Sequence, residues 1–498
     1  MIPGFNTNHV RLLFLRIDDA AAAKQWIRQI YPSIATAREV LDFNRRFKRA
    51  KGRHSFESAV KGAWINIAFS HRGLRKLVGD EADRFTDPAF REPMERSRAS
   101  WVIGGQGSAI DIVVIIAADD PDDLRATVRR VKADIRAANH ETTRGVRVVY
   151  KQKGATRKGV MRGREHFGWA DGVSQPGLRG RLSDAPGDVL TPRYSDDPNQ
   201  GRPGQDLIWP GEFIFGYPGQ DRRGPVEAEG PNSLSPDGER VAPDWAKDGS
   251  YLVFRRLRQN VGAFHRFLYE EGRRHGVRPE ALGARLVGRW PSGAPLVLTP
   301  ITDDPALGGD KQANNDFEFG PADDDEGRKL PRDPGGRLCP FSAHIRKTYP
   351  RDETVAHGEQ DPYRDLRPER TLNESDTQTH RLLRRGIPYG PSAKSTLEKP
   401  VDDAVDRGLL FLAYVTSITD QFEFVSRQWL NDPDFKRPAT GVDPILGQPG
   451  GTDKRGSIET VLPNQTYNVE IGLEEWVTTT GGGYFFAPSV SALQHLAT

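Results

Sequence analysis

The order of apolar strands and amphipathic helices is the feature that most constrains the fold of this chain. Over the first 150 residues, apolar runs predict four strands and a 3.6-residue periodicity predicts two helices. The predicted strands are 9–17, 64–69, 110–117 and 146–150, and the predicted helices are 20–30 and 122–138. The order is βαββαβ, which is the order of a ferredoxin-like unit.

The later half of the chain repeats this order in weaker form. Strands are predicted at 251–257, 408–415 and 484–487, and helices at 260–271 and 418–430. Two segments rich in Pro, Gly and Asp, 190–249 and 298–376, are predicted to be irregular. We therefore expect an α+β protein with two ferredoxin-like domains, each an antiparallel β-sheet with helices packed on it. The expected boundaries are 1–195 and 251–498, with a connector at 196–250.

Charge and cysteine content exclude several classes of protein. Lys and Arg number 71 against 68 Asp and Glu, and a net charge of only +3 does not indicate nucleic-acid binding. The single cysteine, Cys339, rules out intrachain disulfides and thiolate-rich metal sites, which need several sulfurs on one metal. No apolar run approaches the roughly 20 residues that cross a bilayer, and the first ten residues lack a secretion signal. We expect a cytoplasmic protein without a membrane partner.

The first segment that could carry chemistry is 165–177, EHFGWADGVSQPG. Its glycines permit tight turns, and Asp171 is the only carboxylate after Glu165. Asp171 could cap a helix or close an ordinary Asp-Gly turn, or it could act as a general acid and base.

The second segment is 339–352, CPFSAHIRKTYPRD, in which His344 lies among small and apolar neighbours. A lone histidine is often a structural side chain, but it can also bind a metal. An imidazole that binds iron usually donates its other N–H to a carboxylate or carbonyl, so a ligand role for His344 requires such a partner.

The third segment is 380–390, HRLLRRGIPYG. If it is helical, Arg381 and Arg385 share one face and Arg384 points elsewhere. The alternative is a solvated basic helix end, which the helix dipole would favour.

Taken together and in this order, the segments resemble the dye-decolorising peroxidase family. The resemblance rests on G-x-x-D-G at 168–172, A-H-I-R-K at 343–347 with a following Pro350-Arg351, and R-R-G-I-P-Y-G at 384–390. Further likeness lies in SHRGLRKL at 70–77, GLLFLAY…QFEFV at 408–425 and GGGYFFAPS at 481–489. It spans about residues 10–490, and the long insertions resemble the larger subgroup of the family.

The resemblance implies two ferredoxin-like domains, with haem b (iron protoporphyrin IX) held mainly in the second. It implies His344 as the proximal iron ligand, Asp171 as the distal acid–base residue and Arg384 as the distal cation. Such an enzyme reduces H2O2 and oxidises bulky aromatic or dye-like substrates in one-electron steps through a ferryl intermediate. One carboxylate can both remove a proton from peroxide and return it to the departing oxygen. A fixed cation can stabilise the charge that develops along the O–O bond.

Several assignments stay open. The carboxylate partner of the proximal imidazole is Asp420, Glu423 or neither. Arg289 or Arg351 could bind the haem propionates, or could lie on the solvated surface. H2O2 and aromatic reductants are the expected partners, while Mn2+ use and the choice between monomer and homo-oligomer are open.

Two other haem functions and one function without haem are alternatives. A haem-processing protein that releases iron would differ in its products. A haem carrier would satisfy His344 but has no need of Asp171 together with Arg384. An interaction scaffold without a cofactor explains the fold but not the segment around His344.

Overall fold

The computed structural model describes most of the chain. The described residues are 7–52, 62–95, 99–105, 107–139, 145–170, 172–186, 188–191, 199–220, 236–240, 242–320, 330–351, 353–356, 369–372, 377–447, 457–461 and 468–498. The N-terminal half contains the predicted βαββαβ unit, with additional helices. Its elements are β1 (His9–Ile17), α1 (Ala20–Ile30), α2 (Ala37–Gly52), β2 (Ala63–Phe69), α3 (His71–Val78), α4 (Pro88–Arg91), β3 (Ile112–Ala118), α5 (Pro121–Ala137) and β4 (Val146–Ala155). The strands pair antiparallel in the order β4-β1-β3-β2.

Local sequence accounts for these elements. In β1, Leu13 and Leu15 face one core and Leu12 and Phe14 face another, because successive side chains of a strand point to opposite faces. Helix α1 begins after Asp19, whose carboxylate accepts a hydrogen bond from a backbone N–H of the first turn at 2.8 Å.

The C-terminal half repeats the same strand order. Its elements are β9 (Ser250–Gln259), α6 (Val261–His275), α7 (Pro279–Val287), β12 (Leu383–Arg384), β13 (Ile387–Tyr389), β14 (Gly408–Val415), β17 (Val477–Ala487) and α11 (Val490–Ala497). Strand β14 lies between β9 and the short strands β12 and β13, and β9 also pairs with β17. The order matches that of the first half, so the prediction of two ferredoxin-like units in an α+β protein is confirmed.

Two expectations for this half were wrong in detail. Segment 380–390, considered as a helix, contains the strands β12 and β13, since its backbone pairs with β14. The helix predicted at 418–430 consists of two π-helical turns, Ile418–Glu423 and Val425–Leu430. Such turns are rare and are often found at functional sites.

The two segments predicted to be irregular contain short regular elements. They are β6 (Leu207–Ile208), which pairs with β5 (Gly177–Leu178), β7 (Pro218–Gln220), β8 (Pro236–Glu239), α8 (Pro305–Gly309), α9 (His344–Thr348), β10 (Glu353–Ala356) and β11 (Glu369–Leu372). A further hairpin near the C-terminus comprises β15 (Ser457–Val461) and β16 (Asn468–Gly472). The expectation that 190–249 lacks regular pairing was therefore wrong in part. Helix α9 places His344 on a defined element.

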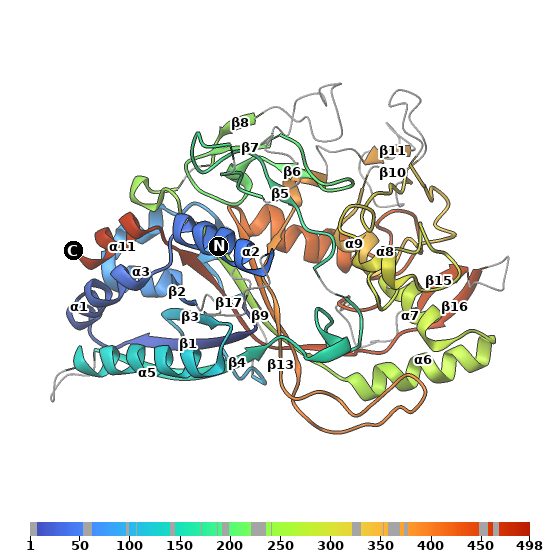
Figure 1. The fold of residues 1–498 in the computed structure, drawn as a ribbon, viewed down its shortest axis with the longest axis horizontal. Helices are drawn as coiled ribbons and strands as arrows, with labels where there is room; N and C mark the ends of the chain where they lie inside the picture. The colour runs from blue at the N-terminus through green and yellow to red at the C-terminus, as the bar shows by residue number, and fades with distance from the viewer. Residues whose placement is uncertain are drawn as a thin grey trace.

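Over the described residues the two halves form one nine-stranded sheet, with the N-terminal half at the left of Figure 1. They join where Phe486 of β17 pairs with Phe69 of β2. Away from this junction their inner faces meet, because the rings of Phe14 and Phe254 lie 5.1 Å apart. The halves therefore share a core that fixes the position of each strand relative to the other half.

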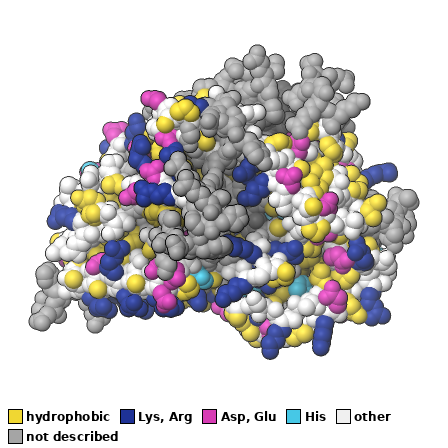
Figure 2. Space-filling view, in the orientation of Figure 1, with side chains coloured by type: hydrophobic (Ala, Val, Ile, Leu, Met, Phe, Trp, Pro, Cys, Tyr) yellow, Lys and Arg dark blue, Asp and Glu magenta, His cyan; other side chains and the backbone are white. Residues whose placement is uncertain are grey.

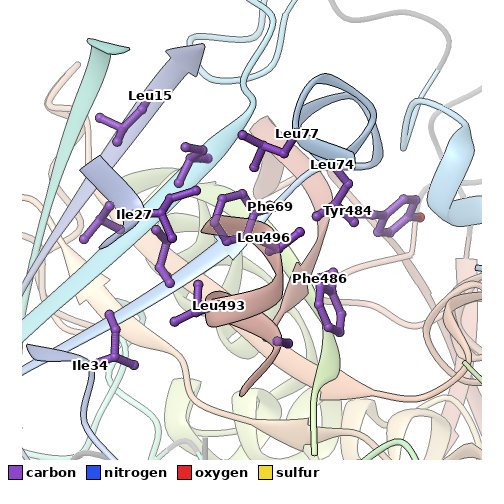
Figure 3. Close-up of a cluster of buried hydrophobic side chains, with 14 of the residues drawn as sticks. Leu15, Ile27, Ile34, Phe69, Leu74, Leu77, Tyr484, Phe486, Leu493 and Leu496 are labelled. Carbon is purple, nitrogen blue, oxygen red and sulfur yellow. The ribbon is translucent and has the colours of Figure 1, made fainter. Parts of the chain in front are cut away.

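The largest core lies between the N-terminal half of the sheet and its covering helices. Figure 3 shows Ile27 of α1, Leu74 of α3 and Leu493 of α11 pointing toward Phe69 on the sheet. Each fully buried side chain of this kind stabilises the fold by roughly 1.5–3 kcal/mol. Helix α11, the last element of the chain, thus completes the core of the first half.

Figure 2 shows both signs of charge scattered over the face in view, with Lys and Arg gathered along the lower left edge, where Figure 1 places α5. Within the described part of the chain, no helix has both the length and the apolar character needed to span a membrane.

Candidate active site

His344 is the first residue of α9 and forms a close pair with a buried carboxylate. Its Nδ1 lies 2.7 Å from Oδ2 of Asp443, whose side chain is fully buried. An ionised carboxylate only accepts, so Nδ1–H is the donor. The other oxygen, Oδ1, accepts the backbone N–H groups of Ile445 and Leu446 at 2.8 and 2.6 Å. These bonds fix the carboxylate, which in turn orients the imidazole ring.

Asp443 is neither of the two partners proposed from the sequence. Glu423 accepts hydrogen bonds from the Tyr484 hydroxyl and pairs with Arg427, both at 2.9 Å. Asp420 lies in the first turn of the π-helical segment, and its backbone N–H donates to Ser417 Oγ at 3.0 Å. The structure thus supports the third possibility, that neither residue is the partner of His344.

A buried network of charges anchors α9. Arg346, which is fully buried, donates to Glu353 at 2.7 and 2.9 Å and to the Cys339 carbonyl at 2.7 Å. Lys436 also pairs with Glu353. Burial by itself would raise the pKa of Glu353, but Arg346 and Lys436 outweigh it and hold the pKa below its ordinary value. The network therefore keeps the carboxylate ionised and the helix in place.

Lys347, also on α9, is buried, and no carboxylate oxygen of the described residues pairs with it. Its Nζ donates to the Asp432 carbonyl at 2.7 Å. Burial lowers the pKa of Lys347 to about 7, although Asp432 and Asp443 oppose that effect.

Arg384 lies on β12 and contacts the segment that contains Asp171. Its Nη2 donates to the Ser174 carbonyl at 2.8 Å. The side-chain amide of Gln175 accepts from the backbone N–H of Arg384 and donates to its carbonyl, each at 3.3 Å. Asp171 itself lies outside the described residues, but Gly172 lines the same cavity as Arg384. The structure therefore brings the first and third candidate segments together.

Hydrogen bonds to a second loop hold the segment before Asp171. Trp169 Nε1 donates to the Arg289 carbonyl at 3.0 Å, and the backbone N–H of Ala170 donates to the Pro291 carbonyl at 3.2 Å. Gly168 has a φ of 109°, a conformation that residues with a side chain rarely adopt. The conformation of the backbone at this position therefore explains why the motif contains a glycine at residue 168.

Arg289 and Arg351 are buried, so the option of a solvated surface is wrong for both. Each donates through Nη2 to Oδ1 of Asn315 at 2.8 Å, and Arg289 Nη2 also donates to Ser174 Oγ at 2.9 Å. Burial, reinforced by Arg351, lowers the pKa of Arg289 to about 9. The Nε of Arg289 is buried and has no hydrogen-bond partner in the described part of the chain. The two buried guanidinium groups and the half-buried Arg384 therefore form a positive region around Ser174 and Asn315.

His166, the histidine of the first candidate segment, is structural. It is 2% exposed, and its ring Nε2 donates to the Tyr389 carbonyl at 2.8 Å. Burial lowers its pKa to about 4, so the ring is neutral. It joins the segment before Asp171 to β13.

Sequence reasoning missed Asp443, Asn315, Ser174 and Gln175. One signal for Asp443 was present, since it is the only charged residue between Arg437 and Asp453. A lone carboxylate in such a stretch indicates a buried partner. The two amides and the serine have no comparable signal, because their role comes from contacts between distant segments.

Comparisons with known proteins agree with this geometry. The family profile described as DyP dimeric alpha+beta barrel domain matches residues 1–158. A dye-decolorizing peroxidase of Mycetinis scorodonius is 33% identical over 459 residues, which cover 86% of this chain and 75% of the relative. A multifunctional dye peroxidase of Amycolatopsis is 30% identical, covering 99% of this chain and 94% of the relative.

A solved structure described as an ancestral D-type dye decolorizing peroxidase matches with a TM-score of 0.76 and 31% identity. The match covers 100% of this chain and 97% of that structure. Because both the sequence and the fold match over nearly the whole chain, it belongs to the dye-decolorising peroxidase family.

Proposed function

We propose that this chain is a haem b peroxidase that reduces H2O2 and oxidises aromatic, dye-like compounds. In this proposal His344 binds the iron, Asp171 transfers protons and Arg384 supplies the distal positive charge. The observation that carries the proposal is the hydrogen bond between His344 and the buried carboxylate of Asp443, since this arrangement orients an imidazole for metal binding.

The residues present fit haem. With Nδ1 committed to Asp443, Nε2 is the nitrogen suited to iron. A thiolate ligand does not fit, because burial raises the pKa of Cys339 to about 12 and keeps it a neutral thiol. The buried Nε of Arg289 is a donor that suits a carboxylate such as a haem propionate. Arg351 is close by, because it donates to the same Asn315 side chain as Arg289.

When bound, haem supplies the redox chemistry that reduces peroxide to water and withdraws single electrons from an aromatic substrate. The carboxylate of Asp443 holds the proton on Nδ1 of His344 and increases the basicity of the ring. The two backbone N–H groups on its other oxygen keep it from rotating away.

In this proposal Asp171 would accept a proton from one oxygen of peroxide and deliver it to the other, which leaves as water. Arg384 would stabilise the negative charge that develops between these transfers. Its hydrogen bond to the Ser174 carbonyl and the clamp by Gln175 fix its position before peroxide enters, so little reorganisation is needed. Leu409 and Phe411 give the same cavity an apolar wall that limits water.

The names of the relatives favour a peroxidase over haem processing or haem carriage. A cytoplasmic location, use of Mn2+ and the oligomeric state stay predictions. One experiment tests the proposed function: the protein is produced with haem supplied, and H2O2-dependent bleaching of a dye is followed together with the haem spectrum. We expect bleaching that requires peroxide while the haem stays intact. Loss of iron from haem without bleaching would instead indicate haem processing.

A further inference from the structure

Helix α5 carries a stripe of positive charge along one face. Its four cations are spaced four, three and four residues apart, so they share that face of the helix: Arg125, Arg129, Lys132 and Arg136. The stripe is about 16 Å long, because each residue of a helix adds about 1.5 Å. By the same periodicity Asp134 lies on the opposite side of the helix. Figure 2 shows Lys and Arg gathered where Figure 1 places α5.

A second row of cations lies on the sheet beside this stripe. In the antiparallel register of β1 and β4, Arg11 pairs with Lys153 and Leu13 pairs with Lys151. Directly paired residues point to the same face of a sheet, and Leu13 belongs to the core that α5 covers. Arg11, Lys151 and Lys153 therefore lie on the side of the sheet that faces α5. Together with the four cations of the helix they make up what we call the α5 basic surface.

The two rows meet at Lys132 and Lys151. Their side chains are in direct contact, and this contact is the largest cause that lowers the pKa of Lys132 below its ordinary value. Burial and the charges of Arg11 and Arg136 lower it further. Like charges held side by side repel one another, and an anion that binds between them removes that repulsion. The contact is therefore a second observation that points to an anionic ligand.

Carboxylates of the described residues neutralise little of this surface. Arg125 pairs with Asp122 of the first turn of α5. In the part of the chain that the structure describes, this is the one ion pair between a carboxylate and any of the seven cations. The charge of the other six is therefore available to a ligand.

The residues between the cations narrow the kind of ligand. On α5 the exposed apolar positions hold only Pro121 and the small Ala126, Ala133 and Ala137, and the exposed positions of β4 hold only cations. Protein interfaces and helices that lie on membranes use aromatic or large apolar side chains as anchors. Single-stranded nucleic acids stack their bases on aromatic side chains. Because these exposed positions provide neither, the surface fits a polymer that binds by charge alone.

We propose that the α5 basic surface binds an extended carboxylated polymer of the acidic polysaccharide class. Guanidinium groups match the two oxygens of a carboxylate, and successive carboxylates of one chain can contact several cations. A flexible chain can follow both rows, whereas a DNA duplex is stiff. The cavity beside Arg384 is lined by Val10 and Ile115, which belong to the opposite face of the sheet. A polymer on the α5 basic surface therefore leaves that cavity open.

The test uses the haem-loaded full chain and polygalacturonate at low ionic strength. Neutral dextran, a DNA duplex and vesicles of phosphatidylglycerol and phosphatidylcholine are the comparison probes, and biolayer interferometry gives the affinities. We expect the wild type to bind polygalacturonate more tightly than any comparison probe. Arg129→Gln should weaken this binding about fivefold, the factor that one cation contributes near an anionic surface. The triple variant Arg129→Gln, Lys132→Gln, Arg136→Gln should weaken it about 100-fold.

Arg130→Gln is the matched control. It removes the same charge from the next position of α5, which is also exposed but lies off the stripe, so its affinity for polygalacturonate should stay close to that of the wild type. Added salt should weaken binding of the wild type more steeply than binding of the triple variant, because fewer counterions are released when fewer cations bind. H2O2-dependent dye bleaching should be the same in the triple variant and the wild type, since α5 lies on the other face of the sheet from the cavity.

Four results would overturn the proposal. They are equal binding of dextran, tighter binding of the duplex or the vesicles than of polygalacturonate, a triple variant that binds polygalacturonate like the wild type, and an Arg130→Gln that loses as much affinity as Arg129→Gln. The inference goes beyond the proposed function, and the two fail separately. A wild type without peroxidase activity would refute the proposed function and leave these affinities unchanged.

Discussion

Asp443→Asn should weaken haem binding while preserving the fold. The substitution keeps the size of the side chain and the oxygen that accepts the N–H groups of Ile445 and Leu446. At the other position it replaces an acceptor by an NH2 group, which would face the Nδ1–H of His344. Two donors cannot bond, so the imidazole loses its partner or moves its proton to Nε2, the nitrogen needed for iron.

The expected loss of haem affinity can be estimated from the one hydrogen bond that Asp443→Asn removes, between Nδ1 of His344 and the carboxylate. Removing the partner of a metal-binding histidine typically reduces metal affinity about 10- to 100-fold. That range corresponds to about 1.4–2.7 kcal/mol. The isosteric change leaves both backbone donors paired, so we expect haem affinity to fall by this amount with a smaller loss of folding stability than Asp443→Ala causes.

Haem affinity is measured by titrating apoprotein with haem and following the Soret band, and thermal unfolding of the apoprotein reports stability. Glu423→Gln is a matched control, since this carboxylate binds Tyr484 and Arg427 instead of His344. The control should retain wild-type haem affinity. If Asp443→Asn bound haem as tightly as the wild type, or if Glu423→Gln weakened it equally, the role assigned to the His344–Asp443 pair would be refuted.

Three further predictions concern the remaining charged groups. Arg384→Leu should slow the reaction with peroxide more than Asp171→Asn, because water can relay a proton but cannot replace a fixed cation; stopped-flow mixing decides the order. Glu353→Gln should destabilise the protein by about 3–5 kcal/mol in urea unfolding, because it removes the counter-charge of the buried Lys436 and leaves the buried Arg346 with the longer pair to Asp333 at 3.3 Å, and a change below about 1 kcal/mol would contradict this. Between pH 7 and 10.5 the unfolded chain holds a proton on Lys347 that the folded chain has lost, because burial lowers its pKa to about 7. The free energy of unfolding should therefore increase with pH across that window, and Lys347→Met should remove this increase. A pH profile that is the same in the variant and the wild type would contradict the lowered pKa of Lys347.

Local patterns predicted the elements whose residues interact with near neighbours. Strand β1 and helix α1 have the bounds that the sequence predicted, because alternation of apolar residues and the Asp19 cap act within a few positions. Strands β12 and β13 were not predicted, since their arginine-rich sequence carries no apolar alternation and their pairing with β14 is decided by tertiary contacts. The domain boundaries at residues 195 and 250 stay a prediction.

The residues of the candidate site also fall into those that sequence motifs predicted and those that only tertiary contacts determine. Family-like motifs pointed to His344 and Arg384, and the structure gives each a partner. The carboxylate beside His344 could not be predicted from proximity in sequence, because it lies 99 residues away. Nor could the burial of Arg289, whose charge faces carbonyl and amide oxygens that only the folded loops bring together.

The measurement that tests the central claim most directly is the haem content of His344→Ala beside the wild type, each produced with haem supplied. The pyridine haemochrome assay gives haem per chain, and circular dichroism establishes that both proteins are folded. We expect the wild type to bind close to one haem with a Soret band, and the folded variant to lose most of it. A folded His344→Ala that retained the haem content and spectrum of the wild type would contradict the assignment of His344 as the iron ligand.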